Sequence, residues 1–538
     1  MNLLKVLSIL GLSFALGACG FQSQGPGAES LSEKAEAWGV LVNENSFQLR
    51  IIDEQDYPVV GAKVLVGFAP GNPFANNVLT TDDAGIADVS IQDWQNPLPV
   101  TVQSRLHLKN TYWRLDPGHH SLRLTLRDGE DLIEVSGQTT GFGNLRTDGN
   151  LHYGLVIPAF TRSDLLHFDI ADVISPEVDV LRILGNRVEV PSNLTLPRQR
   201  ENYVFPITFD KPQYRAFVRS PGVKRFVATH GNFPFRRVID ELRGGKSVFD
   251  VINHFNFISG GLRDIVVGPG GATQDLAVNQ ISFDGKVRVT APQFARDEMM
   301  ISLAMGTQDG YLFPTDVKRF ESGESRDLKA PAASLSENFV LSAFKKMDNP
   351  SGREEDGQES PPVFPDCDPY IYSMCESSEP KISLADLFKD LSQKESFTQL
   401  SFALKSASHS EAVSFLPLIG APEFPPNSPL SHLTLQVPQS PSHVLPVGTL
   451  IILSKIEMTG KGEMKFEKRT RLWQIMAGSW VDQVSLPDIG FQAQPGKAYR
   501  WEVLYLGQDA RTQGQAEQKE GVYSVDVITH VTRNAVDF

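Results

Sequence analysis

The chain has 538 residues, of which 41% are hydrophobic and 21% are charged. This is ordinary globular composition, which excludes wholesale disorder, and the length predicts three or four domains. The formal net charge of -14 argues against DNA or RNA as a partner, because an acidic protein repels a polyanion.

Residues 1–18 have the pattern of a signal peptide. Lys5 supplies a positive charge, an apolar run extends from Val6 to Leu16, and small residues precede Cys19. The run is shorter than the ~20 apolar residues of a membrane-spanning helix, so it predicts export and cleavage.

The residues Leu16-Gly17-Ala18-Cys19 resemble the lipobox of bacterial lipoproteins. The resemblance implies cleavage before Cys19 and a diacylglyceryl group on its thiol, and two or three acyl chains hold a protein on a lipid bilayer permanently. Gly20 stands where lipoproteins of enteric type that stay at the inner membrane have Asp, which implies the outer membrane and leaves the leaflet open. Residues 19–45 are rich in Gly, Ser, Gln, Glu and Ala, and we expect a flexible tether with a reach of roughly 25–30 Å.

Residues 46–130 are expected to form the first folded unit. Apolar and polar residues alternate in Phe47–Ile51 and again in Val59–Val66, which predicts a hairpin of two strands. A second pair of strands is predicted around a tight turn at Gly85, a residue that adopts positive φ without strain.

This first unit resembles the carboxypeptidase regulatory-like, transthyretin-type and bacterial immunoglobulin-like sandwiches. These families share a D-x-x-x-x-P-V-x-G-A-x-V strand pair, here Asp53 to Val64, and a later T-D-x-x-G-x-A turn, here Thr81 to Ala87. The resemblance implies a non-catalytic module that serves as a spacer or a binding platform.

Residues 131–261 are predicted to be a mixed β domain with one helical hairpin. Apolar residues recur at helical spacing from Phe235 to Leu242, glycines interrupt the run, and Ser247 is a candidate cap for a second helix that extends to Phe255. We expect this hairpin to plug one end of a β structure or to cover a sheet edge.

The remaining chain is predicted to be two further β units around a linker. Residues 262–346 alternate as a sandwich does, 347–380 are acidic and broken by proline, and 381–538 open with a short helix and continue as strands. Cys367 and Cys375 are expected to form a disulfide in an exported chain. The sequence thus predicts a mainly β protein of several antiparallel sandwich modules in series.

The search for chemical motifs predicts no catalytic residue, no metal and no cofactor. Arg243–Ser247 is like part of a phosphate-binding loop, but Asp240 stands where the first glycine is required. Asp366-Cys367-Asp368 begins like a calcium loop and lacks its glycine. His119 and His120 are adjacent, so a strand directs them to opposite faces and a turn explains them better than a metal does.

One segment stands out by its charge. Between Pro197 and Lys246 there are eleven Lys or Arg residues and four Asp or Glu residues. A strand at Tyr214–Arg219 places Arg215, Phe217 and Arg219 on one face, which combines cations with a stacking surface. This face is a candidate site for an anionic envelope polymer. The alternative is that its arginines pair with acidic residues of neighbouring segments.

We therefore expect a membrane-anchored envelope lipoprotein that acts as a non-catalytic binding, adhesion or assembly component. Its partners are the lipid bilayer, through Cys19, and an anionic polymer or other envelope proteins. Two alternatives stay open at this point. One is an envelope hydrolase whose carboxylates come from separate strands, and the other is a mechanical spacer.

Overall fold

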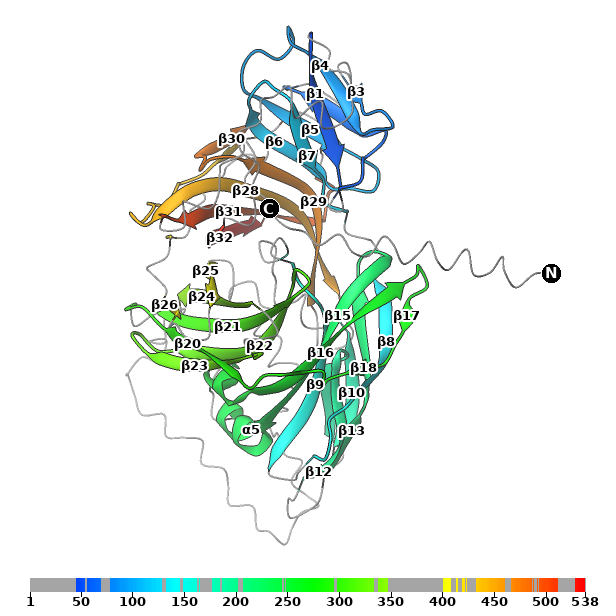
Figure 1. The fold of residues 1–538 in the computed structure, drawn as a ribbon, viewed down its shortest axis with the longest axis vertical. Coiled ribbons are helices and arrows are strands. Elements are labelled where there is room, and N and C mark those ends of the chain that lie inside the picture. Colours follow the sequence, from blue (N-terminus) through cyan, green and yellow to red (C-terminus); the bar gives the residue numbers. More distant parts are fainter. Residues whose placement is uncertain are drawn as a thin grey trace, which may run out of the picture.

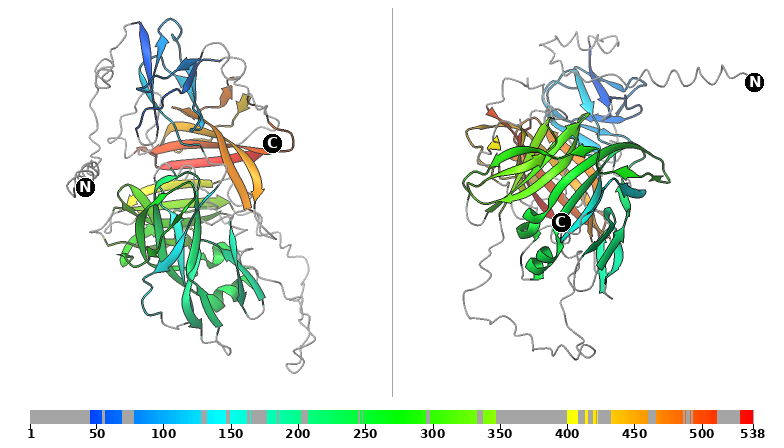
Figure 2. Two further views of the ribbon diagram at one scale, coloured as in Figure 1. Left: turned by 90° about the vertical axis from the view of Figure 1, so that its right-hand side faces the viewer. Right: turned by 60° about the horizontal axis from the view of Figure 1, so that its bottom comes forward.

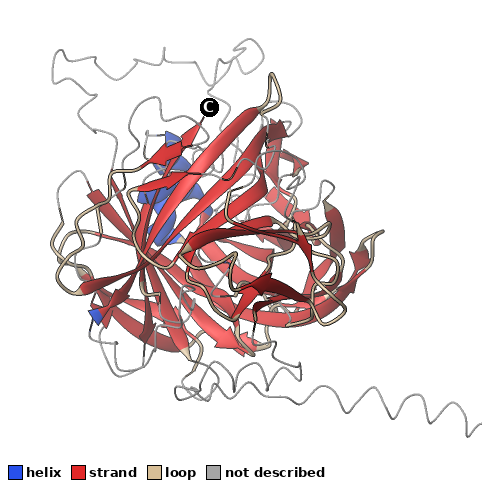
Figure 3. Ribbon diagram, turned by 90° about the horizontal axis from the view of Figure 1, so that it is seen from above, coloured by secondary structure: helices blue, strands red, loops and turns tan. Residues whose placement is uncertain are grey.

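The computed structural model confirms the predicted mainly β class, because strands dominate the described residues and helices are few and short (Figure 3). It describes residues 45–346 and 400–537, apart from gaps at 54–55, 69–77, 128–131, 146–148, 162–163, 165–176, 184–185, 202–206, 244–245, 247, 295–297, 333–336, 408–412, 415–418, 421, 423–431, 460–465, 486, 488–490, 492 and 511–527. Most strand pairs are antiparallel.

The N-terminal unit is a sandwich of two layers. One layer is a three-stranded sheet in the order β4 (Ile86–Ser90), β1 (Ser46–Ile52), β7 (His120–Arg123). The other consists of β6 (Lys109–Leu115), β5 (Leu98–Gln103), β2 (Lys63–Val66) and β3 (Leu79–Thr80). Apolar side chains from both layers, with the fully buried Trp94 among them, fill the space between.

The hairpin expected from Phe47–Ile51 and Val59–Val66 is present only at its turn, where Ile52 and Pro58 form an antiparallel bridge. The expected pairing of the two strands is wrong, because β1 and β2 lie in opposite layers. Alternation identified the strands correctly but carries no information about their partners. The turn at Gly85 is confirmed with φ +73°, and a Cβ there would lie 2.6 Å from the Ile51 carbonyl oxygen. This turn joins strands of the two different layers.

A twelve-stranded sheet extends through much of the molecule. Its strands, in spatial order, are β22 (Tyr311–Phe320), β21 (Glu298–Gln308), β24 (Asn338–Lys346), β25 (Leu400–Ala407), β32 (His530–Asp537), β31 (Ala498–Asp509), β28 (Val444–Thr459), β29 (Phe466–Ala477), β6, β5, β2 and β3. The parallel pair β29–β6 aligns Trp473–Ala477 with Lys109–Trp113. The first unit is thus joined to the C-terminal strands through a sheet as well as through linkers.

The middle region pairs two further sheets. The six-stranded sheet has the order β13 (Ile207–Lys211), β12 (Leu194–Glu201), β9 (Asn150–Pro158), β15 (Gly222–Pro234), β16 (Asn256–Val267), β19 (Ile281–Ser282). The four-stranded sheet contains β14 (Gln213–Val218), β8 (Ile133–Thr140), β17 (Ala272–Thr273) and β18 (Leu276–Ala277). Buried apolar residues of both sheets form one core.

Smaller sheets complete the described strands. They are the hairpin β10 (Val178–Ile183) with β11 (Asn186–Pro191), the sheet β23 (Ser325–Ala330), β20 (Gly285–Thr290), β26 (Val413–Ser414), and the pair β27 (His432–Thr434) with β30 (Gln483–Ser485). The C-terminal strands lie between the N-terminal unit and the middle region (Figures 1 and 2). One apolar core joins the C-terminal strands to the middle region, with Val227, Phe313 and Leu504 among its buried members.

The expected helical hairpin is present as α5 (Phe235–Arg243), α6 (Val248–Val251) and the short η2 (Ile252–His254). Its η2 part covers the edge strand β22, which is one of the two roles expected from the sequence. The backbone N–H of Arg319 donates to Asn253 Oδ1 at 2.7 Å, and Asn253 Nδ2 donates to the Arg319 carbonyl at 3.3 Å. One side-chain amide thus pairs with the edge as a neighbouring strand would.

A second contact protects the same edge. Phe160 and Leu312 exchange both backbone hydrogen bonds, at 3.1 Å and 2.6 Å. The start of β22 is thereby paired with the chain that follows β9, so the middle region closes off the large sheet. Among the described residues, no helix is long and apolar enough to cross a membrane.

Candidate functional site

The predicted basic face lies on β14, an edge strand of the four-stranded sheet. Tyr214, Ala216 and Val218 are buried in the core, while Arg215 and Phe217 are half-buried on the opposite face. The strand and the face that Arg215 and Phe217 share are therefore as the alternation predicts.

Arg215 is neutralised by the hairpin β10–β11 and the residue before it. Its Nη1 lies 2.7 Å from Glu177 Oε2 and its Nη2 lies 2.7 Å from Asp179 Oδ1, and Lys211 Nζ is 3.0 Å from the second oxygen of Asp179. Burial alone would lower the pKa of Arg215, but these carboxylates outweigh it and raise that pKa. This matches the alternative interpretation, in which the arginines pair with neighbouring segments.

Arg219 serves a different contact. Its Nη1 donates to the carbonyl oxygen of Arg469 in β29 at 2.9 Å, so it joins the middle region to the C-terminal strands. Arg215, Phe217 and Arg219 are consequently not a continuous cationic surface.

Arg225, on β15 of the basic segment, is held by two carboxylates. Its guanidinium makes two hydrogen bonds to Asp264, at 2.6 Å and 2.8 Å, and a third to Asp309 at 2.9 Å. It also stacks on Tyr311, 4.8 Å from the ring centre. These contacts raise the pKa of Arg225, with the hydrogen bond to Asp264 as the largest cause. Arg225 therefore clamps the β15–β16 pair to the β21–β22 turn.

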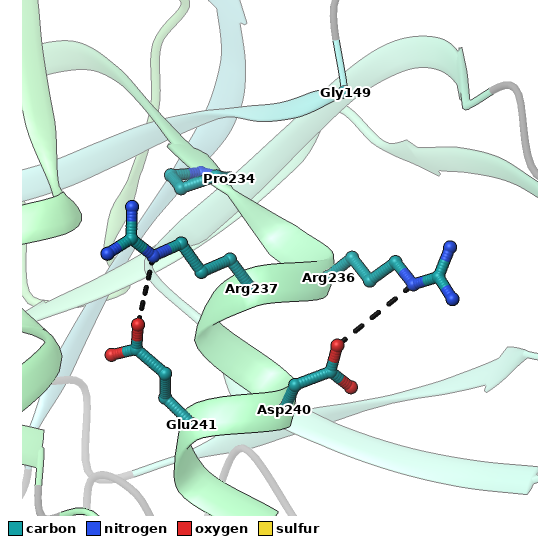
Figure 4. Close-up of a pocket in the computed structure, with 6 residues that line it drawn as sticks. All are labelled: Gly149, Pro234, Arg236, Arg237, Asp240 and Glu241. Atoms are coloured by element: carbon teal, nitrogen blue, oxygen red, sulfur yellow. Dashed lines mark hydrogen bonds and ion pairs between the residues drawn. The ribbon is translucent and has the colours of Figure 1, made fainter.

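An open pocket lies at the start of α5 and is lined by Gly149, Pro234, Arg236, Arg237, Asp240 and Glu241 (Figure 4). The two arginines point in opposite directions, each towards the acid one helical turn on. Arg236 is 4.0 Å from Asp240 and Arg237 is 2.9 Å from Glu241. The lining thus carries both signs of charge in equal number.

Glu241 collects three partners at this pocket. Besides Arg237, it lies 3.2 Å from Lys246 Nζ and 3.0 Å from His254 Nε2. The hydrogen bonds from Arg237 and His254 lower the pKa of Glu241 to about 2. The carboxylate fastens α5 to η2 and stays ionised at all physiological pH values.

A cluster of buried charges on β29, β31 and β32 has no counterpart among the sequence predictions. Glu502 is almost fully buried and lies 2.7 Å from Arg469 Nη1 and 3.2 Å from Arg533 Nη1. Arg500, equally buried, lies 2.7 Å from Asp537. The signal was present in β31, where charged residues alternate with Tyr499, Trp501 and Val503. Only its pairing with β32, and with β28 beside β29, brings the counter-charges to that face.

Two buried histidines face each other in the six-stranded sheet. His152 Nδ1 and His230 Nε2 are 2.9 Å apart, and the side chain of Gln199 hydrogen-bonds to both backbone groups of His152. Burial, and then the neighbouring His152, lower the pKa of His230 to about 4. The two histidines are 78 positions apart in the sequence, so no local sequence pattern predicts that they are in contact.

The other candidates have structural roles or lie outside the described residues. His119 Nδ1 accepts a hydrogen bond from the Gln48 N–H at 3.0 Å, and His120 Nε2 is 2.7 Å from the Asp116 carbonyl. The described part of the chain contains no group of three His, Cys, Asp or Glu residues arranged to hold a metal. Cys19, Cys367 and Cys375 lie outside the described residues.

Comparison with known proteins adds no family. No protein-family model matches the chain, and no curated protein matches it. The Bacillus anthracis TIE protein is 10% identical over 57% of this chain and 45% of its own length, with a TM-score of 0.15. A streptococcal ancillary pilin is 9% identical over 56% and 89%, and BcpA, the major pilin subunit of Bacillus cereus, is 8% identical over 55% and 87%, both with a TM-score of 0.13. At these values the likenesses carry no inference about fold or function.

Proposed function

We propose that this chain is a lipid-anchored, non-catalytic binding and assembly component of the bacterial cell envelope. The lipobox-like residues before Cys19 support the anchor and the outer membrane as its location. The proposed anchor and tether precede β1, so the tether would connect the lipid to the N-terminal sandwich.

The observation that carries the assembly role is the parallel pairing of β6 with β29. Five residue pairs align across it, from Lys109–Trp473 to Trp113–Ala477. Trp473 Nε1 donates to Thr111 Oγ1 at 2.9 Å inside the core, and the Lys109 ammonium lies 5.5 Å from the centre of the Trp473 ring. A sandwich fused in this way cannot swing freely on a linker. It therefore presents the rest of the molecule to a partner at a fixed orientation.

The nature of the partner follows from the charges. Within the basic segment, Arg215 pairs with Glu177 and Asp179, and Arg225 pairs with Asp264 and Asp309. An anionic polymer would have to displace these acids, whereas a protein surface of mixed charge would not. Another envelope protein is consequently the partner that we propose.

Mass spectrometry of the mature N-terminus, combined with crosslinking in intact envelopes, tests this function. We expect an acylated Cys19 and the recovery of discrete crosslinked proteins with the chain. A Cys19→Ser variant should lose the acyl mass and leave the membrane fraction. An unprocessed N-terminus, or envelopes in which the chain crosslinks only to polymer, would contradict the proposal.

A further inference from the structure

The outer end of the β15–β16 pair exposes two valines directly opposite each other. Val223 and Val266 are cross-strand partners and are 64% and 77% exposed. We call this end the valine tip and define it as Ser220–Lys224 together with Ile265–Thr273.

The valine tip extends beyond its neighbours in the six-stranded sheet. β9 pairs with β15 only from Phe226 onwards, and β19 pairs with β16 only at Ser259 and Gly260. The tip is nevertheless rigid, because Ile265 and Val267 on its inner face are buried in the core shared with the four-stranded sheet. Its outer face thus presents apolar side chains on a firm support.

The composition of the tip is unusual for so acidic a protein. Its fourteen residues include one charged side chain, Lys224, and no carboxylate. Lys224 has no acidic partner among the described residues, and its Nζ donates a hydrogen bond to Ser220 Oγ at 2.9 Å. The nearest acid along the two strands, Asp264, lies in the next row, where Arg225 holds it together with Asp309 of the β21–β22 turn.

We propose that the valine tip inserts into the headgroup region of a lipid bilayer, as a second membrane contact beside the acyl anchor. Apolar side chains enter this region to a depth of about 5–10 Å. The absence of carboxylates in the tip means that no negative charge has to be dehydrated. The Arg225 row then marks the depth at which insertion stops.

A bilayer fits this surface better than a protein does. Two valines flanked by Pro221 and Pro269 form a small patch, whereas a stable protein interface buries about 800 Å² on each partner. Lipid needs no complementary shape, and a tethered chain meets the surface at a high effective concentration, so a weak contact is sufficient. The tethering of the chain to the membrane rests on the proposed function.

The test uses the full acylated chain reconstituted in phosphatidylcholine–phosphatidylglycerol vesicles that contain brominated lipid. We expect the added emission of a Val266→Trp variant to be strongly quenched. The matched control is Val60→Trp, because Val60 is 55% exposed on a loop of the N-terminal unit, and its emission should stay unquenched. A Val223→Asp substitution in the Val266→Trp background should reduce the quenching about tenfold.

The proposal would be overturned if the emission of the Val266→Trp variant is not quenched, or if it is quenched no more than that of the Val60→Trp control. A concentration-dependent dimer that Val223→Asp abolishes, without quenching by lipid, would overturn it in favour of a second copy of the chain. If Cys19 carries no acyl mass, the proposed anchor fails on its own. The same variants, added as soluble chains to the vesicles, then still decide whether the tip binds lipid.

Discussion

Single residues of the basic segment act as fasteners between strands. Arg225 is 15% exposed at its side chain and holds two carboxylates from different hairpins, whereas Arg236 is 80% exposed and 4.0 Å from its partner. Charges of one sign that look alike in the sequence therefore differ widely in what they stabilise. Their value depends on burial and on the geometry of the acids that face them.

Replacing Arg225 by alanine is expected to lower the free energy of unfolding by about 2 kcal/mol, because it leaves Asp264 and Asp309 facing each other without their cation. The matched control, Arg236→Ala, should change it by less than about 0.5 kcal/mol. Urea unfolding of both variants measures the difference. Equal effects would show that the Arg225 contacts do not hold the two hairpins together.

His230 makes stability depend on pH. Its pKa in the folded protein is about 4, below the ordinary value of 6.5, so the unfolded chain takes up a proton at a higher pH than the folded one does. The free energy of unfolding contributed by this site is complete above pH 6.5 and falls as the pH decreases towards 4, by up to about 3 kcal/mol. A His230→Asn variant should be less stable at neutral pH and show a flatter decline between these values. An unchanged slope in urea titrations would contradict this assignment.

At the scale of elements, edges decide how the sheets end. The side-chain amide of Asn253 pairs with the free edge of β22. Ser192 pairs with the edge of β14 through its carbonyl and its hydroxyl group. There the Arg215 N–H donates to the Ser192 carbonyl at 2.9 Å, and Ser192 Oγ donates to the Arg215 carbonyl at 2.9 Å. Short polar side chains thus replace a missing strand at two edges that would otherwise be free to pair with another chain.

An Asn253→Ala variant should expose this part of β22. We expect a loss of about 1–2 kcal/mol in the free energy of unfolding and a concentration-dependent tendency to associate. Asn253→Asp keeps the acceptor for the Arg319 N–H and loses the donor, so its free energy of unfolding should fall between those of the wild type and the alanine variant. Urea unfolding and light scattering provide the measurements. Wild-type behaviour of the alanine variant would mean that the hairpin protects the edge by other contacts.

Local features of the elements were predictable and their partners were not. Alternation identified β1, β14 and β31, helical spacing identified α5, and Gly85 identified a turn. These signals depend on neighbours in sequence, which share one face or one turn. The pairing of β1 with β4 and β7, and the meeting of His152 with His230, depend on distant segments and leave no periodic trace. The basic face was placed correctly on its strand, but the acids that neutralise it come from Glu177 and Asp179, upstream of the segment.

At the scale of the whole molecule, the C-terminal strands connect the N-terminal unit to the middle region. They pair with β6 on one side and with β25 on the other, and they share an apolar core with the middle region. Regions that follow one another in the sequence are therefore joined by shared sheets and a shared core. Such a framework keeps the parts of the molecule in a fixed relative orientation.

The β6–β29 pairing also governs the order of events during synthesis. The Thr111 and Trp473 side chains that meet there are 362 residues apart, so the first sandwich leaves the ribosome long before its neighbour strand arrives. Until then β6 has a bare backbone edge in a crowded compartment. The sheet of the first unit is therefore completed only when the last quarter of the polypeptide has been made, and a truncated chain would keep an open edge that is prone to association.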